Sequence, residues 1–188
     1  GIKGIKIIDN YVRKLSNKIK CKKSEILVSS TGVIGEKFDS DIISNQIDKL
    51  DLKNKTDLFE AAKAIMTTDT YPKIAIKKLN IDKKIINIYG FAKGSGMIHP
   101  NMGTMLVYIF IDIKITNTIL KKILNKNMED TFNSITVDGD TSTSDTLMLF
   151  SLKSNNVNLK KSKNLKIILE AINEVMSNLS IQVIKDGE

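Results

Sequence analysis

The sequence contains few of the residues that redox and metal sites most often use. Among its 188 residues there are one cysteine, one histidine and two prolines, and there is no tryptophan. Cys21 has no second cysteine with which to form a disulfide within the chain, which favours a reducing, cytoplasmic compartment. His99 has no second histidine, so we expect neither a histidine-based metal site nor a Ser–His–Asp catalytic centre.

Long apolar runs are also lacking, and the excess of positive charge has no pattern. No uninterrupted apolar run reaches the roughly 18 residues that cross a bilayer, so we expect no membrane partner. Lysine and arginine number 29 against 21 aspartate and glutamate, a net charge of +8. A basic balance can indicate nucleic-acid binding. Here, however, the lysines are spread along the whole chain without interleaved aromatic residues, so we predict no nucleic-acid partner.

Hydrophobic periodicity predicts a chain in which helices alternate with strands. Apolar residues at helical spacing indicate helices, and short apolar runs between turn-forming residues indicate strands. This alternation places the fold in the α/β or α+β class. The expected helices cover residues 5–20, 40–50, 57–66 and 116–128, and residues 165–184 are expected to form a last helix or a helix–strand pair. Asp39 or Ser40 is the expected cap of the second helix, and Thr116 is that of the fourth. The expected strands cover residues 25–29, 73–79, 84–89, 104–113, 135–137 and 146–152, and residues 80–83 are the expected hairpin turn.

A glycine-rich loop, residues 90–103, leads directly into the most apolar strand, which begins at Thr104 and is expected to be covered on both faces. The loop lets the Gly103 carbonyl approach the Thr104 hydroxyl, and attack there converts the peptide bond into an ester that water then splits. The resulting N-terminal threonine carries its own base, because an α-amino group has a pKa of about 7.7–8.0 and lies beside the hydroxyl. Position alone leaves open that Thr104 is only a β-branched residue at the start of a strand.

Other motifs allow both a specific functional interpretation and a purely structural one. Gly94-x-Gly96 is an incomplete phosphate loop without its third glycine, so it does not predict a nucleotide site. The acidic cluster of residues 138–145 misses the spacing of a calcium loop and favours a hydrogen-bonded turn instead. Lys93, which we place on the glycine-rich loop, is by itself better explained as a solvated charge.

Five segments that occur in one order closely resemble the ornithine acetyltransferase family of arginine biosynthesis, also called bifunctional glutamate N-acetyltransferase. The resemblance covers nearly the whole chain. It implies layered mixed sheets flanked by helices, in the manner of self-cleaving N-terminal-nucleophile enzymes. The segments are TGVIG (31–35), MTTDT (66–70), AKGSGMI (92–98), PNMGTML (100–106) and ITVDGDTST (135–143).

The resemblance also implies the catalytic residues. Thr104 matches the family nucleophile, freed by autolysis of the Gly103–Thr104 bond, although the family usually has alanine where Gly103 stands. Thr31 and Gly32 match the pair that stabilises the oxyanion, a role suited to one hydroxyl and one backbone N–H. The expected reaction moves the acetyl group of N-acetylornithine to glutamate by a ping-pong mechanism through an acyl-threonine.

Substrate contacts and assembly follow from the same resemblance. Thr67 and Lys93 match substrate-binding positions, where an ammonium group suits the α-carboxylate of an amino acid. Glu188 matches the acid that holds the side-chain amine of ornithine. No metal or organic cofactor is expected, although acetyl-CoA is a possible co-substrate.

The chain is expected to be one partial catalytic domain, residues 1–188, of a longer precursor. Autolysis would assign residues 1–103 to an α chain and residues 104–188 to a β chain, in an α2β2-type assembly. Two alternatives remain open at this point. An N-terminal-nucleophile amidohydrolase or aminopeptidase would share the fold but release acetate or cleave peptides. A non-catalytic basic binding module would keep the Gly103–Thr104 bond uncut.

Overall fold

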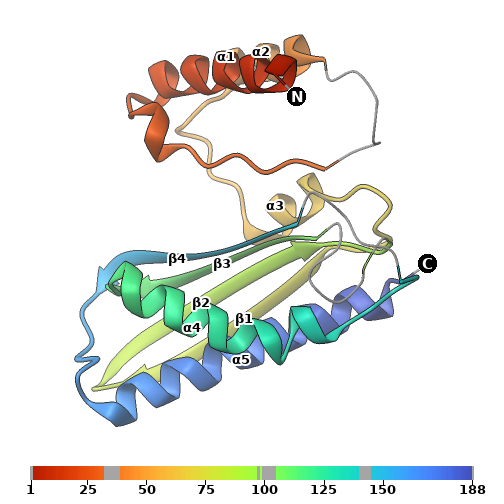
Figure 1. Cartoon of the computed structure of the whole chain (residues 1–188). Coiled ribbons are helices and arrows are strands. Elements are labelled where there is room, and N and C mark those ends of the chain that lie inside the picture. The colour runs from red at the N-terminus through yellow and green to blue at the C-terminus, as the bar shows by residue number, and fades with distance from the viewer. Residues whose placement is uncertain (1, 32–38, 97, 99–104, 140–144, 188) are drawn as a thin grey trace. The chain divides into compact units, whose positions relative to one another are not determined.

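The computed structural model describes residues 2–31, 39–96, 98, 105–139 and 145–187, and Figure 1 shows their arrangement. The chain forms two compact units, Gly1–Thr56 and Asp57–Glu188. The cleavage position expected from the sequence falls inside the second unit, not at the boundary between the two.

The first unit is a pair of helices. Helix α1 spans Ile2–Ile19 and helix α2 spans Ser40–Lys49, and a small core of Tyr11, Val12 and Ile47 lies between them. The expected N-cap of α2 is confirmed, because the Asp39 carboxylate accepts a hydrogen bond from the backbone of Asp41 at 2.9 Å.

The strand expected at residues 25–29 is wrong. A 3-10 turn, η1, covers Lys23–Glu25, and residues 26–31 have no regular structure. Leu27 is 65% exposed, so the apolar run is not buried as a strand in a sheet would be. An apolar run becomes a stable strand only where neighbouring strands and a core receive it.

The second unit is a two-layer α/β structure. Its sheet has the order β1-β2-β3-β4, in which β1, β2 and β3 are antiparallel neighbours and β4 is parallel to β3. The elements are α3 Leu58–Ala64, β1 Lys73–Ile81, β2 Lys84–Lys93, β3 Leu106–Ile113, α4 Asn117–Glu129, the 3-10 turn η2 Phe132–Ser134, β4 Thr146–Asn155 and α5 Ser162–Lys185.

The β1–β2 hairpin is longer than the sequence indicated. Its turn is reduced to Asp82 and Lys83, both of which have positive φ, 51° and 63°, as a two-residue hairpin turn that follows the twist of the strands requires. Strand β2 continues to Lys93, into the segment expected to be a loop, because it pairs with β1 on one side and β3 on the other.

Strands β3 and β4 are parallel, so the chain must cross over between them, and α4 makes this crossover. Thr116 is its N-cap as expected, and its hydroxyl accepts a hydrogen bond from the backbone of Ile119. The short strand expected at 135–137 is reduced to an isolated bridge between Ile98 and Val137.

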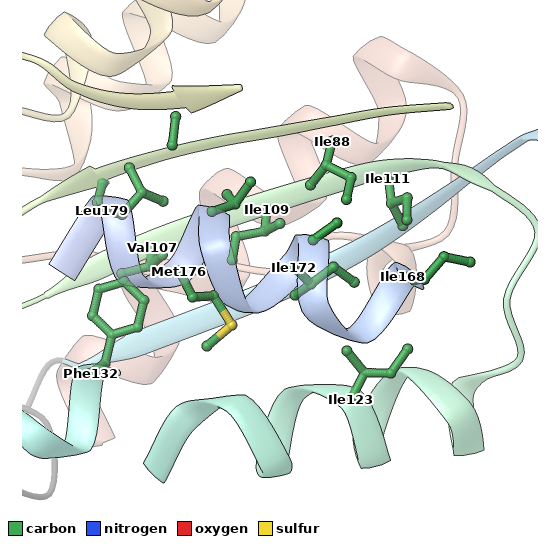
Figure 2. Close-up of a cluster of buried hydrophobic side chains, with 14 of the residues drawn as sticks. Ile88, Val107, Ile109, Ile111, Ile123, Phe132, Ile168, Ile172, Met176 and Leu179 are labelled. Atoms are coloured by element: carbon green, nitrogen blue, oxygen red, sulfur yellow. The ribbon is translucent and has the colours of Figure 1, made fainter. Parts of the chain in front are cut away.

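Helices α4 and α5 cover one face of the sheet (Figure 1). Side chains from that face and from both helices form one aliphatic core, shown in Figure 2. Ile88, Ile109 and Ile111 of the sheet and Ile172 of α5 are fully buried. Gly90 lies directly under α5, where an added Cβ would be 2.8 Å from Leu179 Cδ1, so glycine permits the close approach of helix and sheet.

Helix α5 is long and apolar enough to cross a membrane by length and composition. The core helix of a soluble protein meets the same criteria. Here Ile168, Ile172 and Met176 of α5 are buried in the aliphatic core, which accounts for the apolar composition of the helix without a bilayer.

The opposite face of the sheet is aromatic and only half-buried. Phe91 and Tyr108 lie 5.1 Å apart between ring centroids, and Phe110 stacks on Phe150 at 5.0 Å. The sequence led us to expect the strand after Thr104 to be covered on both faces. In the structure β3 is fully buried on the face that carries Ile109 and half-buried on the other.

Candidate functional site

The structure brings together two of the site residues that the sequence singled out. Thr67 and Lys93 both belong to the second unit, whereas Thr31 belongs to the first and is partly exposed. The remaining predicted site residues lie outside the described residues; they are Gly32, Gly103, Thr104 and Glu188.

Lys93 is the last residue of β2, and its side chain is 2% exposed. The ammonium nitrogen donates a hydrogen bond of 2.7 Å to the hydroxyl of Thr67, which lies in the segment after α3. The interpretation of Lys93 as a solvated surface charge is therefore wrong. A lysine loses much hydration when it is buried, so a buried ammonium needs partners.

Asp69 is the acidic partner closest to this pair. Its carboxylate accepts hydrogen bonds from the backbone N–H of Thr67 at 3.1 Å and of Gly94 at 2.6 Å. It also lies 3.9 Å from the Lys93 ammonium. One carboxylate thus contacts both chain segments that carry the predicted substrate-binding side chains.

A second buried cation, Lys73 at the start of β1, completes the cluster. Its side chain is 0% exposed and donates to Asp69 at 2.7 Å and to Asp186, the residue that follows α5. Asp186 also accepts hydrogen bonds from the backbone and hydroxyl of Thr70. The Lys73 ammonium lies 5.0 Å from the centroid of the Tyr71 ring, a cation–π distance.

We call Asp69, Lys73, Lys93 and Asp186 the buried ionic cluster. It contains two cations and two carboxylates, so its formal charges cancel. Charges are retained in a protein interior only where opposite charges and hydrogen bonds compensate for the lost hydration.

The pKa values in this cluster follow from its contacts. Burial acts to raise the pKa of Asp69, but hydrogen bonds from Lys73 and from the backbone of Gly94 and Thr67 outweigh it and lower the value. The pKa of Asp186 is lowered in the same way, by Lys73 and Thr70 against the effect of burial. Burial lowers the pKa of Lys93, and the charge of Asp69 partly offsets that effect.

The backbone immediately after the predicted nucleophile is fixed on both sides. Met105 is fully buried; its N–H donates to the Asp145 carboxylate at 2.8 Å, and its carbonyl accepts from the backbone of Thr146 at 2.8 Å. Burial raises the pKa of Asp145, although the hydrogen bond from Met105 acts to lower it. Met105, the residue after Thr104, is therefore held through both its N–H and its carbonyl by one segment of the chain, residues 145–146.

The described carboxylates of the acidic cluster, residues 138–145, accept hydrogen bonds from the backbone. Asp138 accepts a hydrogen bond from the N–H of Ile98 at 3.3 Å, and Asp145 accepts one from Met105. In the described part of the chain, no three histidine, cysteine, aspartate or glutamate side chains are grouped so that they could hold a metal ion.

A lysine ammonium beside a threonine hydroxyl, at the end of a strand, is suited to hold a carboxylate. The cluster lies where β2 ends, and the chain then runs towards Thr104. The sequence matches the ArgJ family over residues 1–188. The chain belongs to the ArgJ family.

Relatives within the ArgJ family are similar along all or most of this chain. A protein of Bartonella henselae is 40% identical over 100% of this chain and 47% of its own length. One from Bradyrhizobium diazoefficiens is 43% identical over 89% of this chain and 42% of its own length, and one from Agrobacterium fabrum is 38% identical over 100% and 47%. Each is named arginine biosynthesis bifunctional protein ArgJ. The chain therefore spans about half the length of these curated relatives.

Sequence reasoning missed three members of the buried ionic cluster. Asp69 lies inside the segment MTTDT, which was noted for its resemblance to the family but was not given a chemical role. Lys73 opens a strand and Asp186 follows a helix, and neither position suggests burial. The only signal was the i, i+4 spacing of Asp69 and Lys73, which is not informative outside a helix.

Proposed function

We propose that this chain is the central part of an acetyltransferase that moves the acetyl group of N-acetylornithine to glutamate. The observation that carries the proposal is the buried Lys93–Thr67 pair, 2.7 Å apart, in a chain of the ArgJ family. The pair lies at the end of the strand that leads to Thr104, where an amino-acid substrate would present its acetyl group.

The reaction proceeds in two half-reactions. Thr104 Oγ attacks the acetyl carbonyl carbon while the α-amino group of Thr104 takes the hydroxyl proton. The amide bond breaks, and ornithine leaves with that proton on its amine. The glutamate amine then attacks the acyl-threonine ester, and Thr104 recovers its proton as N-acetylglutamate forms.

Each surrounding residue has a role in these steps. Lys93 and Thr67 bind the α-carboxylate of the substrate, and Glu188 binds the side-chain amine of ornithine. Thr31 and Gly32 donate hydrogen bonds to the oxyanion, and the loss of one such donor typically raises the barrier by about 2.7–4 kcal/mol. No metal or organic cofactor takes part, and acetyl-CoA is a possible second acetyl donor.

The α-amine of Thr104 becomes available only after autolysis of the Gly103–Thr104 bond. That cut falls between β2 and β3, which are hydrogen-bonded neighbours in one sheet. The two products, 1–103 and 104–188, would therefore stay together as the α and β chains of a single fold. An α2β2-type assembly of such chains in the cytoplasm is part of the proposal.

The test uses the complete protein, of which this chain is part. Incubation with N-acetylornithine labelled in its acetyl group, followed by acid quench and peptide mapping, is expected to place the label on Thr104. The Thr104→Ala protein is expected to remain a single uncut chain and to transfer no acetyl group. Transfer to glutamate at the native rate by that variant would refute the proposal.

Two further measurements address the alternatives. Release of free acetate at the same rate with and without glutamate would indicate an amidohydrolase. An intact mass without cleavage at Gly103–Thr104, together with the absence of label, would indicate a non-catalytic binding module. Acetylglutamate as the glutamate-dependent product supports the transferase.

A further inference from the structure

Asp69 connects the two chain segments that would bind the substrate. One of its oxygens accepts the N–H of Thr67 at 3.1 Å, and the other accepts the N–H of Gly94, directly after Lys93, at 2.6 Å. These two contacts fix the backbone positions from which the Thr67 and Lys93 side chains extend. A neutral hydrogen bond of 2.6 Å between Thr68 and Ser95 links the same two segments one residue further along each.

Asp69 also acts on Lys93 through its charge. The carboxylate lies 3.9 Å from the Lys93 ammonium, and both side chains are almost completely buried, at 1% and 2% exposed. At this distance inside a protein, a carboxylate stabilises the protonated form of a lysine. Among the described residues, the other charged group that acts on Lys93 is Lys73, whose positive charge acts in the opposite direction.

Lys73 favours the ionised form of the Asp69 carboxylate and contacts a different oxygen from the one near Lys93. Lys73 pairs with Oδ1 of Asp69, and Lys93 lies near Oδ2. Lys73 donates to Asp69 and to Asp186, and so its charge is shared between two carboxylates. Among the described residues, the Lys93 ammonium donates a single hydrogen bond, to Thr67. An ammonium has three N–H groups, so the described contacts leave Lys93 donors for a substrate carboxylate while Asp69 favours its charged form.

We propose that Asp69 is a positioning residue of the acetyl-transfer site, which sets the geometry of Thr67 and Lys93 and keeps Lys93 protonated. The inference rests on the proposed function, because it requires that Lys93 binds the carboxylate of the substrate. In this role Asp69 need not contact the reacting atoms. Its effect is exerted through Lys93 and through the backbone on either side.

The experiment compares Asp69→Asn with Asp186→Asn in the complete protein. Both changes remove one buried carboxylate charge from Lys73, so both are expected to lower the melting temperature. Only Asp69 faces Lys93. The substrate is acetyl-labelled N-acetylglutamate, the donor of the reverse half-reaction, because it has no amine that titrates in the alkaline range.

For Asp69→Asn, kcat/KM for acylation of Thr104 is expected to fall about 10²-fold at pH 7, as a misplacement of about 1 Å in a binding group can cause. The alkaline limb of its pH profile is expected to move to lower pH, because Lys93 loses the charge that favours its protonated form. In Asp186→Asn the alkaline limb is expected to stay where it is in the wild type.

An alkaline limb that stays at the wild-type pH in Asp69→Asn would overturn the positioning role, even if activity falls. If Asp69→Asn does not fold, the pair Asp69→Glu and Asp69→Gln replaces it. These two side chains have the same length and differ in charge, so the limb is expected at lower pH in the glutamine variant. An alkaline limb at the same pH in the two variants would also overturn the inference.

The outcome remains distinct from that of the proposed function. If wild-type protein acquires no label on Thr104, the acetyltransferase proposal fails, and the role of Asp69 fails with it. If Thr104 is labelled but substitution of Asp69 does not move the alkaline limb of the pH profile, only the positioning role fails.

Discussion

Strand β1 is joined to the α5 end of the fold by two lysine–carboxylate pairs that differ in burial. Lys73 pairs with Asp69 and with Asp186, just after α5, and these side chains are 0% and 1% exposed. Lys77, four residues along the same strand, pairs with Glu174 of α5, and their side chains are 34% and 61% exposed. Both lysines pair with a carboxylate, and burial is the first difference between them.

The two pairs also differ in what surrounds them. The Lys73 pairs belong to a network that reaches Lys93 and the backbone of the predicted substrate-binding residues. The Lys77 pair lies at the edge of the sheet and faces water. Burial of charge is costly unless every member is compensated. Under the proposed function the buried ionic cluster supports the Lys93–Thr67 pair, whereas the exposed pair joins β1 to α5 at the surface.

Removal of the buried cation is expected to have the largest effect. Lys73→Met keeps the length of the side chain but leaves Asp69 and Asp186 buried without their shared partner. Removal of one partner of a buried ion pair typically lowers the free energy of unfolding by about 3–5 kcal/mol. Urea unfolding of the complete protein at pH 7 measures the loss, and a loss below about 1 kcal/mol would mean that water reaches the carboxylates.

The aliphatic core provides the reference for that value. Ile172 is fully buried between α5 and the sheet (Figure 2), and Ile172→Ala would remove packing without any charge. A truncation of this kind typically costs about 2–5 kcal/mol, from lost transfer free energy and the cavity left behind, and we expect about 3 kcal/mol here. The same urea measurement checks it, and its cost should not change between pH 7 and pH 4.

Acid pH should distinguish Lys73→Met from Ile172→Ala, because only the stability cost of Lys73→Met is expected to depend on pH. The pKa values of Asp69 and Asp186 are lowered in the fold against the effect of burial. Both carboxylates therefore contribute stability above their unfolded pKa of about 3.9, and that contribution is lost as the pH falls through their folded values. In Lys73→Met the largest contribution that lowers both pKa values is lost, so both carboxylates are expected to protonate at higher pH than in the wild type, and protonation relieves the unpaired charges.

The stability difference between wild type and Lys73→Met is therefore expected to narrow on acidification. The change is smaller than the cost of the substitution itself, because protonation restores no hydrogen bond from Lys73. Unfolding curves of both proteins at pH 7, 5 and 4 measure the narrowing. A difference that stays constant over this range would show that the cluster is not ionised as its contacts imply.

Much of the fold could be predicted from local patterns, and most of the site could not. The helix caps at Asp39 and Thr116 and the hairpin around Asp82 depend on neighbouring residues, so the sequence is sufficient to find them. The extent of β2 to Lys93 depends on strands that lie on both of its sides. A sequence pattern does not contain that information.

The site residues divide in the same way. Thr67 and Lys93 were found through a resemblance that extends over five segments, and the structure places their side chains 2.7 Å apart. Asp186 was missed because its partners Lys73 and Thr70 are more than a hundred positions away in the chain. Only the packing of the end of α5 against the start of β1 brings these charges together.

The smallest expected effect is that of neutralising the exposed pair. Glu174→Gln keeps the size of the side chain and one acceptor oxygen and removes the negative charge, 2.6 Å from the Lys77 ammonium. Water and salt screen exposed pairs, so the cost is expected to be at most about 0.5 kcal/mol and to vanish at about 1 M salt. Urea unfolding at low and high salt measures it, with Lys73→Met as the variant that should keep its full cost at both. If Glu174→Gln costs as much as Lys73→Met, burial is not what distinguishes the two pairs, and the buried ionic cluster owes its strength to something other than the exclusion of water.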